Sequence, residues 1–177
     1  TSEEIVRQKL LRILHYEYGY PINTMATEIG IRSGSKILKD ENGKDIRADV
    51  IVYQDVEACA SRNQGKIHLV CECKKPDELS GYNQLVSYIF NTSASGGLWY
   101  NGSPGAIQYF RRKDRPLALE KWLNIPCHGE SWASLDSKIE IELLSPHPNI
   151  TNLLNRCHNY IHKYGTDTEE EDLTMDM

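Results

Sequence analysis

Apolar side chains recur along the chain in two different periods, which predict helices and strands. Residues 2–18 carry apolar positions every three or four residues, as on one face of an amphipathic helix, with Arg7 on the solvent side. Ser2 suits the capping position at the start of this helix. Shorter apolar runs at 48–53 and 67–73 have the length and composition of strands. We therefore expect a first helix and two buried strands.

The same pattern predicts the elements around these strands. Residues 25–31 form a strand that 36–39 would continue beyond a Ser-Gly break, and 54–65 form a loop. Residues 77–91 predict a second helix. Two further strands are expected at the positions 97–100 and 106–110.

Beyond residue 110 the pattern weakens. Residues 116–148 predict an irregular segment packed on the domain, with a candidate strand at 138–144. Apolar residues then recur at helical spacing, and the last twelve residues hold six acids and no base. We expect a single domain over 1–148, an amphipathic helix over 149–165 that leads into a following domain, and a disordered acidic tail over 166–177.

Composition is that of a globular protein, with 177 residues, 40% hydrophobic and 25% charged. No segment approaches the ~20 apolar residues that cross a bilayer, and no signal peptide precedes Thr1, so we expect a cytoplasmic protein that contacts no membrane. Five cysteines, an odd number, predict reduced thiols. A zinc site with ligands from Cys127-His128 and Cys157-His158 is one alternative, but buried apolar cysteines fit the spacing better.

Residues 66–76, KIHLVCECKKP, set two charged side chains inside an apolar strand. Side chains alternate across a sheet, so Glu72 and Lys74 share one face, and Cys71 and Cys73 share the other. Burial of either charge alone would cost on the order of several kcal/mol, so the site must hold a compensating charge or open to solvent. A divalent cation bound to the carboxylate would compensate the charge and keep the site open to solvent. The alternative is a solvated pair on an edge strand, worth roughly 0–1 kcal/mol.

Asp49 stands at the head of the preceding strand. If the two strands pair in register, Asp49, Glu72 and Lys74 converge. Two carboxylates and an amine would then form an oxygen-ligand metal site with a lysine beside it.

These residues together resemble the PD-(D/E)xK nuclease superfamily, and more narrowly the amino-terminal endonuclease domain of type I restriction enzyme R subunits. The resemblance covers residues 2 to about 113 and rests on four elements in the family's order: the helix SEEIVRQKLL, RADV at 47–50, ECKKP at 72–76, and QLVSY at 84–88, which is similar to the QxxxY element of that family. It implies an α/β, restriction-endonuclease-like core with a central mixed β-sheet flanked by helices. More weakly, LLNRCHNYIHKYG is similar to a segment that leads into an N6-adenine methyltransferase module in fused restriction-modification proteins.

The resemblance implies hydrolysis of DNA phosphodiester bonds that depends on Mg²⁺ and leaves a 5′-phosphate. Asp49, Glu72 and the carbonyl of Cys73 would bind the ion, a hard cation that prefers oxygen ligands. Lys74 would orient the attacking water or help to deprotonate it. A cation nearby would lower the pKa of Lys74.

Four further side chains have roles in the resembling family. An acid of its first helix approaches the metal four residues before an arginine; Glu3 matches that place, with Glu4 in reserve. Simple placement near the helix dipole is the alternative. Gln84 and Tyr88 lie four apart on one helix face and would orient the metal-site residues or contact the DNA backbone. A tyrosine packed at the edge of the core is the alternative for Tyr88.

Basic side chains are candidates for contacts with phosphates. Lys75 and the basic run that contains Arg111 and Arg112 would touch DNA, although a solvated loop is the commoner fate of such runs. The net charge of −5 neither supports nor opposes this, because partner domains could hold the DNA.

The implied partners are double-stranded DNA, a helicase or methyltransferase, and specificity domains or subunits. The sequence has no GxxxxGK[ST] loop and no NPPY-type motif, so ATP or S-adenosylmethionine would act only through those partners. Two alternatives are a non-catalytic domain of nuclease fold that docks DNA or a partner, and a DNA repair nuclease of the same superfamily. The intact set of Asp49, Glu72 and Lys74 argues against docking, and Gln84 with Tyr88 favours the restriction family.

Overall fold

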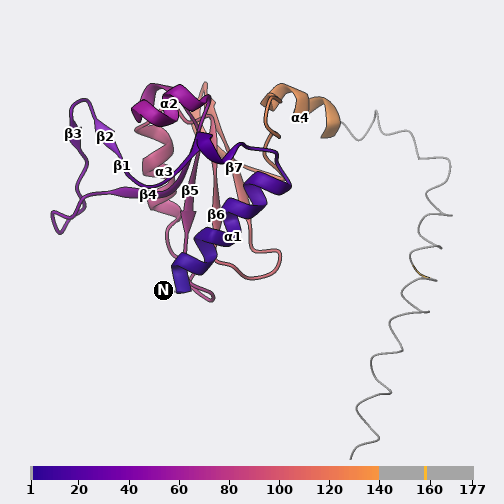
Figure 1. Ribbon diagram of the computed structural model, residues 1–177, viewed down its shortest axis with the longest axis horizontal. Helices are drawn as coiled ribbons and strands as arrows, with labels where there is room; N and C mark the ends of the chain where they lie inside the picture. Colours follow the sequence, from indigo (N-terminus) through magenta and orange to yellow (C-terminus); the bar gives the residue numbers. More distant parts are fainter. Residues whose placement is uncertain (1, 140–157, 159–177) are drawn as a thin grey trace, which may run out of the picture. The chain divides into compact units, whose positions relative to one another are not determined.

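The computed structural model describes residues 2–139 and His158 (Figure 1). The chain divides into two compact units, residues 1–137 and 138–177, and the fold below is that of the first. The predictions for 149–165, apart from the exposed helical residue His158, and for 166–177 lie outside the described residues.

A six-stranded mixed sheet forms the centre of the first unit. Its strands, in spatial order, are β1 (Met25–Gly30), β4 (Arg47–Tyr53), β5 (Ile67–Cys73), β6 (Gly96–Tyr100), β7 (Gln108–Asp114) and β8 (Leu117–Trp122). Neighbouring strands are antiparallel except β5 and β6, which run parallel. The prediction of an α/β fold with a central mixed sheet and flanking helices is confirmed.

Helices α1 (Ser2–Tyr16) and α3 (Tyr82–Phe90) cover opposite faces of this sheet (Figure 1). Val50 of β4 belongs to the core under α1, whereas the next residue, Ile51, belongs to the core under α3. This alternation follows from the pleat of a strand that is buried on both sides. Helix α3 also provides the crossover that a parallel pair of strands requires.

Strands β4 and β5 are adjacent, as the apolar runs predict. They pair antiparallel with Val50 opposite Cys71 and Ile51 opposite Val70. Extended by one position, this register sets Asp49, near the start of β4, opposite Glu72, near the end of β5. The fold therefore brings together two carboxylates that are far apart in the sequence.

The segment between the first two long strands differs from the prediction. Residues 36–39 do not continue β1; β2 (Arg32–Ser33) and β3 (Lys36–Ile37) form a separate hairpin instead. Gly34 has a φ of +61°, which a turn between such short strands uses and which glycine adopts without strain.

Other predicted boundaries are also wrong. The expected loop at 54–65 contains α2 (Val56–Ser61), whose N-cap Asp55 accepts a hydrogen bond from the Ala58 amide. Helix α3 begins later than residue 77, the first helix ends at Tyr16, and β7 extends through the basic run. Part of the expected irregular segment is strand β8, and residues 138–139 end helix α4 (Trp132–Ile139) instead of starting a strand.

The described cysteines are free thiols. Cys59, Cys71 and Cys73 are buried and Cys127 is exposed. Among the described residues no three His, Cys, Asp or Glu side chains are grouped so as to hold a metal ion, and Cys157 of the zinc alternative lies outside those residues. Across the same part of the chain, no helix is long and apolar enough to cross a membrane.

Candidate active site

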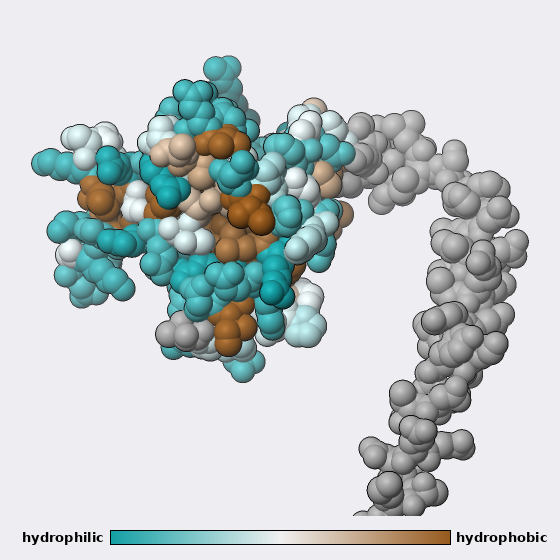
Figure 2. Space-filling view, viewed as in Figure 1, coloured by the Kyte–Doolittle hydropathy of each residue, from teal (hydrophilic) through white to brown (hydrophobic). Residues whose placement is uncertain are grey.

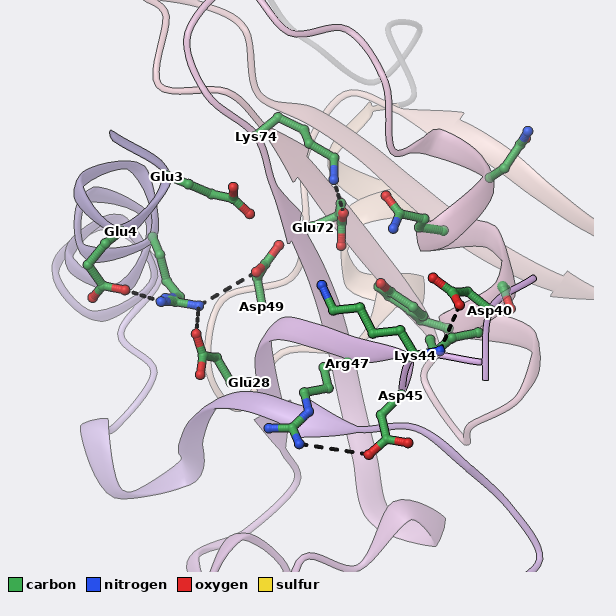
Figure 3. A pocket seen from close by; sticks show the side chains of 16 residues that line it. Glu3, Glu4, Glu28, Asp40, Lys44, Asp45, Arg47, Asp49, Glu72 and Lys74 are labelled. Carbon is green, nitrogen blue, oxygen red and sulfur yellow. Dashed lines mark hydrogen bonds and ion pairs between the residues drawn. The ribbon is translucent and has the colours of Figure 1, made fainter. Parts of the chain in front are cut away.

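A pocket of about 840 Å³ lies where β4 begins and β5 ends, and charged side chains dominate its lining (Figure 3). The start of α1, strand β1, residues 40–47 and helix α3 form its walls. It contains Asp49, Glu72 and Lys74, so the three residues predicted to converge do lie together.

Asp49 is fixed by the neighbouring strand. Its Oδ2 accepts a hydrogen bond of 2.7 Å from the backbone amide of Cys73, and its side chain is 15% exposed. Burial raises the pKa of Asp49 and the charge of Glu3 adds to this, against the opposing effects of the Cys73 amide and Arg7. The carboxylate is therefore held in a place where a negative charge lacks full compensation.

Glu72 is almost fully buried, with 3% of its side chain exposed, and forms an ion pair of 2.6 Å with Lys74 through Oε1. Its second oxygen, Oε2, is buried without a hydrogen bond of ordinary geometry in the described part of the chain. Burial and the charge of Asp49 raise the pKa of Glu72 to about 7, although Lys74 acts in the opposite direction. An unpartnered oxygen of this kind is a position for a ligand.

Lys74 keeps its proton in this arrangement. Burial lowers the pKa of Lys74, but the ion pair with Glu72 and the nearby charges of Asp49 and Glu3 outweigh burial, so the net shift is upward. The predicted lowering of this pKa concerns a site that holds a cation, and it stays a prediction.

The first helix supplies two acids and an arginine to the pocket. Glu3 points toward the space in front of Asp49, whereas Glu4 turns to Arg7, with which it forms an ion pair (Figure 3). Arg7 also contacts Glu28 Oε1 at 2.9 Å and Asp49 Oδ1 at 3.6 Å. The structure thus places Glu3, the preferred candidate, beside Asp49, and gives Glu4 a different partner.

Arg7 and Glu28 are site residues that the sequence pattern did not predict. Arg7 was expected to face solvent, yet its side chain is only 13% exposed and contacts carboxylates from three elements. Glu28 has a φ of +54°, a value that is uncommon outside glycine. It lies in β1 between Thr27, which pairs with Val50, and Ile29, which pairs with Ala48. The spacing of Glu3 and Arg7 was a usable signal for Arg7, whereas Glu28 had none.

Helix α3 contributes Gln84 and Tyr88 to the lining. Gln84 is exposed, whereas Tyr88 is 2% exposed and packs in the core under α3. Burial, the charges of Glu72 and Asp49, and a hydrogen bond with Glu72 raise the pKa of Tyr88. Tyr88 therefore packs in the core, as the alternative predicts, and also borders the pocket, while its role in orienting site residues or contacting DNA stays a prediction.

The remaining basic candidates are not gathered at the pocket. Lys75 is exposed and does not line it. Arg111 forms an ion pair of 2.7 Å with Asp136, and Arg112 one of 2.8 Å with Asp114. Both arginines lie in strand β7 instead of a solvated loop. A contact of these three residues with DNA stays a prediction.

The buried carboxylate predicts a loss of stability as pH rises from about 4.5 to about 7, the ordinary and the raised pKa of Glu72. Between these values the unfolded chain has released the proton while folded Glu72 retains it, so folding becomes less favourable. The shift corresponds to at most about 3 kcal/mol. Urea unfolding of the wild type and Glu72→Gln at pH 5 and pH 8 measures it. We expect a smaller pH effect in the variant, and equal effects would contradict the assignment.

The fold and the pocket define an α/β protein of restriction-endonuclease-like architecture with carboxylates and a lysine at the ends of adjacent strands. The chain matches the family described as the type I restriction enzyme R protein N terminus over residues 2–126, and it belongs to that family. No curated protein and no solved structure matches the chain.

Proposed function

We propose that this domain is the Mg²⁺-dependent endonuclease of a restriction enzyme and hydrolyses DNA phosphodiester bonds. The observation that carries the proposal is the convergence of Asp49, Glu72 and Lys74 in one pocket of a chain from this family. Double-stranded DNA is the proposed substrate. The proposed partners are specificity subunits and a helicase or methyltransferase, through which alone ATP or S-adenosylmethionine would act.

The residues present fit a hard divalent cation. Glu72 Oε2 is buried without a hydrogen bond of ordinary geometry among the described residues, and the charge of Asp49 raises the pKa of Glu72. A cation between the two carboxylates would relieve this repulsion. Asp49, Glu72 and the carbonyl of Cys73 would hold Mg²⁺ and leave its other positions to water, as this ion prefers. The bound cation would neutralise charge on the scissile phosphate and make water more acidic.

The chain's own residues prepare the reaction. The Cys73 amide and Arg7 hold the Asp49 carboxylate in place. Lys74 as an ammonium donates hydrogen bonds that orient water and a phosphate oxygen, and it acts as a base once it has lost its proton. The oxygen of water bonds to phosphorus and gives a proton to neutral Lys74 or to solvent, the bond from phosphorus to the 3′ oxygen breaks, and that oxygen takes up a proton from solvent. The products are a 5′-phosphate and a 3′-hydroxyl.

Asp49→Asn tests this function, because it removes the charge of one ligand with little change in shape. We expect Mg²⁺ or Mn²⁺ to raise the melting temperature of the wild type and not of the variant. We also expect nicking of supercoiled plasmid to fall by at least about 100-fold, a loss within the range for a group on which the chemistry depends. Asp77→Asn is the matched control, since Asp77 is exposed and lies outside the pocket lining.

Two results would overturn the proposal. If the cation stabilised the wild type and Asp49→Asn equally, the proposed metal site would be contradicted. A wild-type domain that binds the cation but leaves DNA intact, both alone and within the complete restriction enzyme, would favour a docking role instead.

A further inference from the structure

Residues 31–46 form an arm that projects from the sheet (Figure 1), and Asp40, Lys44, Asp45 and Ile46 of this arm line the pocket. Its outer part is the hairpin of β2 and β3, and its inner part is a turn closed by the bridge between Lys39 and Asp45. Backbone hydrogen bonds of 2.8–2.9 Å join Ile31, Leu38 and Ile46 at its base. Ile31 is fully buried there, so the arm is anchored in the core and holds a defined position.

The first half of the arm, residues 31–39, carries positive charge only. Arg32, Lys36 and Lys39 are exposed, and no acid occurs between Ile29 and Lys39. Figure 2 shows hydrophilic side chains at the edges of the projecting part, with a hydrophobic patch between them. Three exposed cations on a short ribbon repel one another and add nothing to the core, so they are available to an anionic partner.

The acids of the arm are mostly engaged within it. Asp40 Oδ1 accepts hydrogen bonds of 2.9 Å from the amides of Asn42 and Lys44, and so fixes the turn. Asp45 lies 3.8 Å from Arg47. These contacts fix the two side chains but leave their charges in place, and Glu41 is exposed, so three acids offset part of the four positive charges of residues 31–46.

The positive charge continues from the hairpin to the pocket. Lys44 and Arg47 line the pocket, and the Lys44 side chain extends toward the centre where Glu72 lies (Figure 3). The basic side chains therefore run from the outer hairpin to the place where a phosphate would be cleaved.

We propose that this arm binds the phosphate backbone of double-stranded DNA and holds the duplex against Asp49 and Glu72. The inference rests on the proposed function. DNA carries one negative charge per ~1.7 Å of helix axis, and a two-stranded ribbon fits the major groove or lies along the backbone. An acidic pocket repels phosphates, so cations beside it are needed to bring DNA there in a protein whose net charge is −5.

The test compares two variants with the same change in charge. The arm variant combines Arg32→Gln, Lys36→Gln and Lys39→Gln. The control combines Lys9→Gln, Arg12→Gln and Lys121→Gln, which remove exposed cations from helix α1 and strand β8. Fluorescence anisotropy with a duplex of about 30 base pairs, in Ca²⁺ to prevent cleavage, gives the Kd between about 50 and 200 mM salt.

We expect the arm variant to lose at least about 10-fold in affinity at 100 mM salt, and the slope of log K against log salt to fall by about 0.9 for each lost phosphate contact. The control should lose much less and keep its slope. Both should retain the melting shift with Mg²⁺, which shows that the pocket is intact.

Equal losses in the two variants would overturn the inference, because they would reflect net charge alone. Preference for single-stranded DNA or RNA over the duplex would also overturn it. The metal site has a separate test. If Mg²⁺ raises the melting temperature of the wild type and not of Asp49→Asn, the metal site is supported even when the arm variant binds DNA normally.

Discussion

Lys74→Met is expected to reduce DNA cleavage by roughly 10²–10⁴-fold, the range found when a positioned proton donor or acceptor is removed. The Lys74 ammonium lies 2.6 Å from Glu72 Oε1 in the pocket, with 13% of its side chain exposed. Arg7 cannot replace it, because its guanidinium already contacts Glu4, Glu28 and Asp49. Methionine retains most of the apolar stem and removes the charge.

The same substitution has a stability effect that depends on pH. At pH 8, where Glu72 is ionised, loss of Lys74 leaves a buried carboxylate unpaired and destabilises the fold. At pH 5.5 Glu72 holds a proton, since its pKa is raised to about 7, and the penalty should be smaller. Cleavage must therefore be measured well below the melting transition. The matched control is Lys9→Met on the exposed face of α1, which should cut and melt like the wild type. Normal cleavage by Lys74→Met would exclude Lys74 from the mechanism.

The candidate site was predictable from sequence because strands fix geometry over short distances. Apolar runs identified β4 and β5, and the two-residue alternation placed Glu72 and Lys74 on one face. Antiparallel pairing with Val50 opposite Cys71 then sets Asp49 against Glu72. The local pattern did not show that these two strands pair with each other. That expectation came from the resemblance to a known family.

The environment of Arg7 could not be predicted from the helical periodicity of the sequence. The apolar positions of α1 correctly identify Val6, Leu10 and Leu14 as the core face, but they say nothing about what the polar sides of the helix meet. The first turns of α1 line the pocket at the ends of the strands, so a polar side of the helix faces other charges there. Tertiary placement decided the environment of Arg7.

Glu28 and the arm had weaker local signals. A positive φ at a glutamate inside a strand follows from contacts that the local sequence does not describe. The hairpin of β2 and β3 has only two residues in each strand, too few for an alternation to be visible. Helix α2 is similarly short, with six residues, and the polar residues that follow it resemble a loop.

Gly81 provides the second large expected effect, because its lack of a side chain leaves room for Lys74. A Cβ at Gly81 would lie 2.5 Å from Lys74 Cε and 3.1 Å from Glu72 Cγ. The backbone there cannot easily retreat, since Trp99 Nε1 donates a hydrogen bond of 2.7 Å to Ser80 O and Trp99 is 3% exposed. The flexible end of Lys74 must therefore move.

We expect Gly81→Ala to reduce cleavage by roughly 10- to 100-fold, the loss typical of a group that supports site residues without reacting itself. Gly81 has a φ of +101°, so alanine also adds backbone strain of roughly 1–2 kcal/mol. Gly129→Ala is the matched control: Gly129 has a φ of +83°, but a Cβ there would meet nothing within 4 Å. Backbone strain should destabilise both variants, Gly81→Ala somewhat more because Lys74 is displaced from Glu72, and only Gly81→Ala should lose activity well below the melting transition.

The pH dependence of cleavage separates a displaced lysine from a general loss of stability. The ion pair with Lys74 lowers the pKa of Glu72, so moving the ammonium away should raise that pKa further. If ionised Glu72 is needed to hold the cation, the acidic limb of the cleavage profile of Gly81→Ala should shift to higher pH, while Gly129→Ala keeps the wild-type profile. Equal activity and identical pH profiles for the two variants would show that the position of Lys74 does not depend on Gly81.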